Sequence, residues 1–166
     1  MKNKLFINFI TFVLICLGSN LKAETIFFDS KNIKIEENGN MIFATKGQAK
    51  IPSSNLVIEG DKFIYNKINS ELIVIDDVKY FDDENNIYIE SDKIIYNEIN
   101  NTIFSKSDTY IKSEADYEIN SNDVLYDRNL NKILSNEYTN VSDKNLNNFL
   151  FKKVLIFELI LKIIFS

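Results

Sequence analysis

The sequence predicts an all-β protein in which antiparallel strands follow one another as a meander and fold into two layers. One phrase recurs about every thirty residues, as "IKIEENGNMIFA" at 33–44, "FIYNKINSELIV" at 63–74, "IIYNEINNTIFS" at 94–105 and "VLYDRNLNKILS" at 124–135. Apolar and polar residues alternate between these copies, and no sustained helical stripe occurs before the last twenty residues. Regular spacing together with strand periodicity indicates one supersecondary unit that is used repeatedly.

Residues 1–23 have the pattern of a secretory signal peptide. Lys2 and Lys4 precede an apolar run from Leu5 to Gly18, and a short polar stretch then ends at Ala23. A basic start, an apolar stretch that is short for a membrane span and a small residue at the cleavage position are typical of such a signal. We therefore expect export of the chain, with cleavage after Ala23.

Charge and composition argue against several classes of function. Removal of residues 1–23 takes away three lysines and no acid, so 16 basic side chains remain against 24 acidic ones, a net charge of −8. Such a chain is a poor candidate for binding nucleic acid. It has no histidine, which is the commonest general base and transition-metal ligand, and Cys16 lies inside the signal. We expect no enzyme, no cofactor, no metal site and no disulfide.

Two groups of acidic residues are candidate sites for chemistry, Asp76-Asp77 and Asp82-Asp83-Glu84. Two carboxylates can cleave a glycosidic bond, and clustered carboxylates can hold Ca²⁺ weakly. Both groups fall where the pattern places turns between strands, where solvated acids are expected. We interpret them as turn residues.

Each recurring unit reads as a strand, a turn rich in Asn, a second strand and another polar turn. Asn38-Gly39 in the first turn is a strong local signal for a hairpin. The polar stretch "DDENN" at 82–86 marks a turn at the opposite end of the strands. The chain is therefore expected to run back and forth as long antiparallel strands.

A second phrase joins the copies, and its apolar pattern changes phase. Ile87 and Ile89 alternate with polar residues, but large residues resume at Ile94 and Tyr96, on the opposite parity. A shift of one residue is what a β-bulge introduces. We expect such shifts at Gly60–Lys62, Ser91–Lys93 and Ser121–Asp123. The strands would bend along this ridge, so that the meander folds over as a two-layer β-jelly roll or open cuff.

These phrases resemble a known family. "NLVIEGDKFIYNKINSELIVIDDVKYF" at 55–81 and "NIYIESDKIIYNEINNTIFSKSDTYI" at 86–111 are similar to the OstA-like repeat of the lipopolysaccharide-transport proteins, with Asp-Lys before the Tyr-containing strand. The resemblance covers about residues 24–146 and is strongest to a truncated N-terminal periplasmic domain of the outer-membrane lipopolysaccharide-assembly protein. It implies an OstA-like β-jelly roll, open along one side, whose apolar interior holds acyl chains.

Strand parity and the resemblance together indicate the lining of that interior. The expected lipid-binding residues are Leu56, Ile58, Ile87, Ile89 and Ile119 before the bulges, and Phe63, Tyr65, Ile94, Tyr96 and Tyr126 after them. Apolar cover would shield acyl chains from water. The same side chains would equally form the filled core of a small sandwich, and the sequence leaves both interpretations open.

The resemblance also implies partners and a location. We expect a periplasmic or outer-membrane-associated module that binds the lipid A acyl chains of lipopolysaccharide. Its other partners would be homologous OstA-like domains, added end to end by strand pairing, and outer-membrane assembly components. The alternatives are a membrane-tethered β-repeat surface or adhesion protein, or a non-functional truncated remnant.

Residues 147–166 form a hydrophobic tail that departs from the repeat. The pattern calls for a small polar residue at Phe151, and the repeat breaks by about Phe149. Glu158 and Lys162 are spaced as an i,i+4 pair that a helix could use. An interfacial helix, a membrane tether and an accidental peptide all remain open for this tail.

Overall fold

The computed structural model describes residues 26–113, 117–152, 154–157 and 163–164, so the expected signal at 1–23 lies outside the described residues. The strands are β1 (Phe27–Glu36), β2 (Met41–Ile51), β3 (Leu56–Asn66), β4 (Glu71–Asp82), β5 (Ile87–Asn97), β6 (Thr102–Ser105), β7 (Thr109–Ser113), β8 (Glu118–Ser121), β9 (Val124–Asp127), β10 (Lys132–Ser135), β11 (Thr139–Ser142), β12 (Asn148–Phe151), β13 (Val154–Phe157) and β14 (Ile163–Ile164). Two short 3₁₀ helices, η1 (Glu37–Gly39) and η2 (Pro52–Ser54), connect β1 to β2 and β2 to β3.

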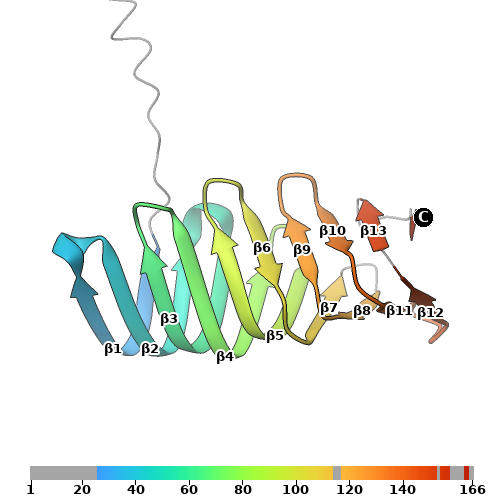
Figure 1. Ribbon diagram of the computed structural model, residues 1–166, viewed down its shortest axis with the longest axis horizontal. Coiled ribbons are helices and arrows are strands. Elements are labelled where there is room, and N and C mark those ends of the chain that lie inside the picture. Colours follow the sequence, from blue (N-terminus) through green and yellow to red (C-terminus); the bar gives the residue numbers. More distant parts are fainter. Residues whose placement is uncertain (1–25, 114–116, 153, 158–162, 165–166) are drawn as a thin grey trace, which may run out of the picture.

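The strands form an open, antiparallel, meander-like sheet, as the sequence predicts. β1 to β5 pair in chain order, and every ladder between described strands is antiparallel. Figure 1 shows the strands standing side by side along the long axis of the molecule. Ile, Val, Phe and Tyr supply most of their apolar positions, and these residue types favour extended backbone. The all-β prediction is therefore confirmed.

The sheet divides into two layers beyond β5. Residues 87–91 of β5 pair with β7, whereas residues 95–97 pair with β6. The front layer of Figure 1 then continues through β6, β9, β10, β13 and β14, and the back layer through β7, β8, β11 and β12. The two halves of β2 to β5 belong to the same two layers. Each long strand thus crosses from one layer to the other.

A ridge of irregular backbone separates the layers at the predicted positions. The register of β3 against β4 shifts between Glu59 and Lys62, and that of β4 against β5 shifts between Ile75 and Val78. At the third position β8 ends and β9 begins after a gap of two residues, 122–123. Burial changes parity across the ridge as predicted, because Leu56 and Ile58 are buried before it and Phe63 and Tyr65 after it.

The recurring phrase corresponds to a recurring turn at the end of the front layer. In three successive hairpins, the side-chain oxygen of the last strand residue accepts a hydrogen bond from the backbone N–H three residues later; the pairs are Asn66 and Asn69, Asn97 and Asn100, and Asp127 and Leu130. A residue with positive φ ends each turn, namely Ser70, Asn101 and Asn131. Asn and Asp suit both roles, which explains why the turns are rich in them.

The sheet continues into the tail, beyond the point at which the repeat in the sequence breaks. β12 pairs with β11 in the back layer, and β13 pairs with β10 in the front layer. Val154–Phe157 is therefore a strand, and the helix considered for this segment is wrong there; Glu158 and Lys162 lie outside the described residues. Among the described residues, no helix is long and apolar enough to span a membrane.

We predict that Gly47→Ala detaches β1 from the sheet. A Cβ atom at Gly47 would lie 2.0 Å from the carbonyl oxygen of Asp29 and 2.7 Å from Cα of Ser30, and backbone atoms cannot rotate away. The free energy of unfolding should fall by about 2–3 kcal/mol, measured by urea denaturation. The control is Gly39→Ala, where no atom lies within 4 Å of the new Cβ and only the φ of +92° opposes the change. It should cost about 1 kcal/mol, and an equal loss from both substitutions would contradict the close approach at Gly47.

Candidate functional site

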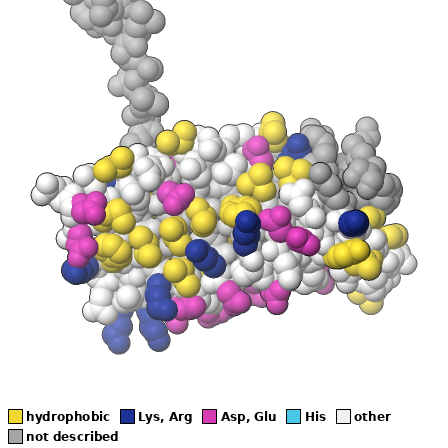
Figure 2. Space-filling view, viewed as in Figure 1, with side chains coloured by type: hydrophobic (Ala, Val, Ile, Leu, Met, Phe, Trp, Pro, Cys, Tyr) yellow, Lys and Arg dark blue, Asp and Glu magenta, His cyan; other side chains and the backbone are white. Residues whose placement is uncertain are grey.

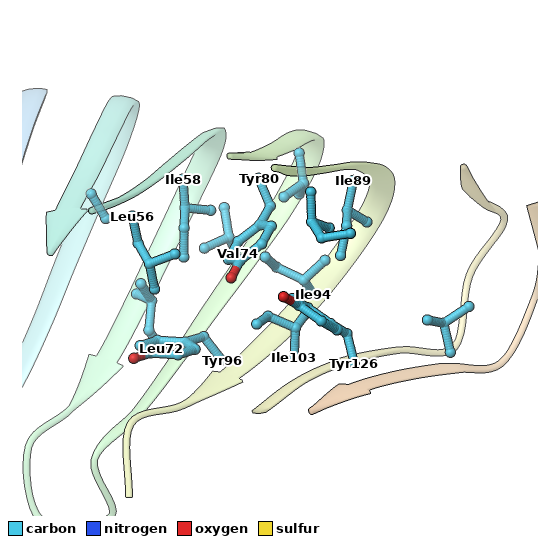
Figure 3. Close-up of a cluster of buried hydrophobic side chains, with 14 of the residues drawn as sticks. Leu56, Ile58, Leu72, Val74, Tyr80, Ile89, Ile94, Tyr96, Ile103 and Tyr126 are labelled. Atoms are coloured by element: carbon cyan, nitrogen blue, oxygen red, sulfur yellow. The ribbon is translucent and has the colours of Figure 1, made fainter. Parts of the chain in front are cut away.

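The structure brings all ten expected lipid-binding residues into one interior between the two layers. Each is at most 7% exposed. The back layer supplies Leu56, Ile58, Ile87, Ile89 and Ile119, and the front layer supplies Phe63, Tyr65, Ile94, Tyr96 and Tyr126. Figure 3 shows the side chains of this cluster pointing toward one another from both layers. Their contact with lipid stays a prediction.

Other residues of this interior escaped the sequence reasoning. The second strands of the hairpins contribute Leu72, Val74, Tyr80, Ile103 and Ile133, all buried. Leu72 is the ladder partner of both Tyr65 and Tyr96, so it faces the same side of the sheet. Leu72, Ile103 and Ile133 occupy the tenth position of successive copies of the repeated phrase. This recurrence of an apolar residue is the sequence signal that could have placed them in the interior.

The apolar lining reaches solvent at the β1 end. Ile33 and Ile35 pair with Ala44 and Ile42, and residues directly opposite in a ladder share one face of the sheet. Ala44 is buried, yet Ile33 and Ile35 are 48% and 62% exposed. Inward-facing apolar side chains thus lie uncovered on the first strand.

A buried ion pair joins the two layers on the side opposite the ridge. Nε of Arg128 donates to Oδ2 of Asp82 over 2.7 Å, and its Nη2 donates to Oδ1 over 3.1 Å. Arg128 follows β9 in the front layer, whereas Asp82 ends β4 in the back layer. It is the only ion pair among the described residues with both side chains buried.

Further hydrogen bonds satisfy the guanidinium. Arg128 also donates to the carbonyl oxygen of Ser54 over 3.1 Å, to Oδ1 of Asn101 over 2.9 Å and to Oε2 of Glu84 over 3.3 Å. These partners lie in three different turns, at 52–55, 83–86 and 98–101. A single side chain therefore ties together the ends of four hairpins, its own included.

Two tyrosines complete the network around Asp82. The hydroxyl groups of Tyr126 and Tyr80 donate to Oδ2 of Asp82 over 3.1 Å and 3.4 Å, and their rings meet edge to face with centroids 6.4 Å apart. Burial and the charge of Asp82 raise the pKa of both tyrosines above its ordinary value. Both side chains are therefore neutral donors at neutral pH.

The carboxyl group of Asp82 is held in its charged form. Burial disfavours the charge, but hydrogen bonds from Arg128 and Asn85 and the positive charge of Arg128 outweigh this, so the pKa of Asp82 lies below its ordinary value. Asn85 donates through its backbone N–H over 3.1 Å and through its side chain over 2.9 Å. A carboxylate with several donors of this kind stays ionised at neutral pH.

These findings correct the interpretation of the acidic groups in part: Asp83 and Glu84 are exposed residues of the turn after β4, as expected, but Asp82 is not. Asp82 is 1% exposed and paired, and Asp76 and Asp77 lie inside β4 at the ridge, both with positive φ. The sequence holds one signal for this buried pair: Arg128 is the single arginine among 19 basic residues. Arginine is the basic residue best suited to a buried, bidentate pair with a carboxylate.

The outer face of the molecule carries its own apolar row. Ladder partners line up across the front layer as Phe43, Ile64, Ile73, Ile95, Phe104, Leu125 and Leu134. They are half-buried and face away from the interior, and Figure 2 shows hydrophobic side chains over this face. Neighbouring side chains of such a row stabilise a sheet through cross-strand contacts.

The hollows on the surface follow the ridge rather than the interior. One of about 770 Å³ is lined mainly by polar side chains, including Asp77, Glu90, Asp92, Asp108 and Asn120. None of the ten expected lipid-binding residues lines it. In the part of the chain that the structure describes, no group of three or more His, Cys, Asp or Glu side chains is placed to hold a metal ion.

Comparison with known proteins adds no family. No family model matches the chain, and no curated protein matches it.

We predict that Asp82 and Arg128 depend strongly on each other. Arg128→Met leaves a buried carboxylate without its cation and should lower the free energy of unfolding by about 3–5 kcal/mol, measured by urea denaturation. Asp82→Asn should also destabilise, because the guanidinium loses its charged partner. The double variant should lose clearly less than the sum of the single variants. Additive losses would show that the two side chains stabilise the fold independently.

We also predict a specific acid sensitivity. Because the pKa of Asp82 is lower in the folded chain than in the unfolded one, where it is about 3.9, the stabilisation is fully present above that value. It is lost as the pH falls through the lower folded pKa. The urea midpoint of the wild type should therefore drop more steeply below about pH 5 than that of Asp82→Asn. Parallel curves for the two proteins would contradict a depressed pKa at Asp82.

Proposed function

We propose that the chain is a lipid-carrying module of lipopolysaccharide transport, an OstA-like β-jelly roll whose interior shields acyl chains in the periplasm. The observation that carries the proposal is the continuity of the apolar interior. Every strand from β2 to β11 contributes at least one buried apolar side chain to it. Such an interior extends across the whole stack of strands, which suits a long and flexible ligand.

The physical benefit of this arrangement is continuous cover for hydrocarbon. Leaving an acyl chain in water costs roughly 0.8 kcal/mol per CH₂ group. Neighbouring strands, about 4.8 Å apart, present similar Ile, Leu and Tyr side chains, so the affinity for a chain would vary little along the stack. A lipid bound in this way can move along the interior without crossing a large barrier.

The acidic exterior also supports binding of the lipid in the interior. Exposed carboxylates of Asp77, Asp92 and Asp108 follow the outside of the ridge, and Asp and Glu side chains mark the lower edge of Figure 2. A phosphorylated sugar head would be repelled from this side. Binding outside the interior would therefore be disfavoured.

The β1 edge suits the addition of a homologous domain. Among the described residues, β1 pairs only with β2, so one side of its backbone is open for a further strand. A strand added there would also cover the exposed side chains of Ile33 and Ile35. We propose that copies or relatives of this module stack at this end and extend the apolar interior.

The test is photo-crosslinking in a Gram-negative periplasm. A photoreactive residue at Ile89, which faces the interior and is 1% exposed, should form an adduct with lipopolysaccharide. The control is Lys79, which is next to Tyr80, the ladder partner of Ile89, and faces outward. The adduct is expected at Ile89 only, detected with an antibody against the sugar moiety.

Two other results would count against the proposal. Equal adducts at both positions would indicate contact with lipid from outside. Adducts at neither position, in a protein shown to be folded by circular dichroism, would mean that the interior is only a structural core.

A further inference from the structure

The two layers meet again on the side opposite the ridge, which we call the mouth. Figure 1 shows turns of both layers along this upper side. The front layer contributes the turns at 67–70, 98–101 and 128–131, and the back layer those at 52–55 and 83–86. Arg128 reaches across from the front layer to Asp82 and to the carbonyl oxygen of Ser54 in the back layer. The ion pair therefore closes the mouth.

The ridge has the features of a hinge. The registers of β3 against β4 and of β4 against β5 shift there, whereas the β1–β2 and β2–β3 ladders keep one register. Beyond β5 the chain leaves the ladder at 106–108, 122–123 and 136–138. Inside the bend the buried side chains are small hydroxyl residues such as Ser91, Ser105, Ser121 and Ser135. The two layers could separate about this line without breaking ladder hydrogen bonds within either layer.

The closed arrangement leaves an acyl chain no open route through the mouth. Tyr80 and Tyr126 meet from opposite layers with ring centroids 6.4 Å apart, directly beneath the ion pair. The side chains that would contact lipid are buried against one another. An acyl chain that enters through the mouth needs the layers to part, and among the described residues the Asp82–Arg128 pair is the buried ion pair that joins them there.

We propose that the Asp82–Arg128 pair is a latch on the mouth, which opens to admit an amphiphile with an acyl chain and an anionic head. This inference rests on the proposed function, because it assumes that the interior takes up lipid. An anionic head offers Arg128 the same acceptor oxygens that it gives up when it leaves Asp82. Binding of the ligand would thus offset the loss of the pair.

The test is to lock the mouth reversibly. Ser53 and Asn129 are exposed neighbours of Ser54 and Arg128 on opposite sides of the mouth. Ser53→Cys and Asn129→Cys, in a Cys16→Ser background, would be joined by a flexible, reducible bifunctional thiol reagent. The probe is the fluorescent fatty acid dansyl-undecanoic acid, whose emission rises in apolar surroundings. The uptake rate should fall by at least about tenfold when locked and recover after addition of a reductant.

A matched crosslink controls for the reagent. Asn100 and Asn129 lie in neighbouring turns of the front layer, where the side-chain amide of Asn129 donates to the carbonyl oxygen of Asn100 over 3.2 Å. Asn100→Cys with Asn129→Cys joins two turns on the same side of the mouth. This crosslink should leave the uptake rate unchanged. An equal slowing by both crosslinks would overturn the latch.

The converse variant opens the latch. Asp82→Asn with Arg128→Gln removes both charges and weakens the hydrogen bonds between the two side chains, so uptake should accelerate by about tenfold or more. The control pair is Asp29→Asn with Lys50→Gln, an exposed ion pair between the neighbouring strands β1 and β2, which does not join the two layers and should not change the rate. If the opening variant does not fold, the crosslinked proteins still decide.

The outcomes separate the latch from the proposed function. Equal uptake by locked and unlocked protein would overturn the latch while the lipid-binding function stands. No uptake by any form, in protein shown to be folded, would overturn the proposed function and the latch with it.

Discussion

The structure depends on one constraint, the change of side-chain parity in the middle of each strand. A sheet that folds over keeps the same face inside in both layers, but an extra residue at a β-bulge changes which alternate positions point to that face. In β3 and β5 the irregular residues at the ridge shift the pattern by one position, so that apolar side chains face inward on both halves. The interior, the ridge and the mouth all follow from this shift.

The sequence shows this change of parity directly in the first strands. The apolar positions change parity between Ile89 and Ile94, and this change indicates where the bulge lies. The choice of inner face was harder in the front layer, because apolar residues occupy both parities there; Ile95, for example, faces outward beside Ile94 and Tyr96. Only the ladder partners in the structure distinguish the interior from the outer apolar row.

The sequence could not reveal the contacts that cross the mouth. Asp82 stands in a run of acids that reads as a solvated turn, and its partner lies 46 residues away along the chain. Periodicity describes neighbours within a sheet but carries no information on which turns of opposite layers meet. A buried ion pair also contributes little net stability compared with apolar residues of the same size, and the single arginine, although suited to such a pair, does not indicate which carboxylate it meets. The Asp82–Arg128 pair instead fixes how the two layers close at the mouth.

The order of the ladders has a consequence for folding kinetics. Strands adjacent in the sheet are joined by short turns through β5, so each hairpin can form from local contacts and add to the previous one, which favours rapid folding for an all-β chain. The contacts of Arg128 with Asp82 and Ser54 span 46 and 74 residues. Loop closure over such distances needs the intervening hairpins in place. The chain is therefore expected to assemble as an open sheet first and to bring its two layers together in the last step.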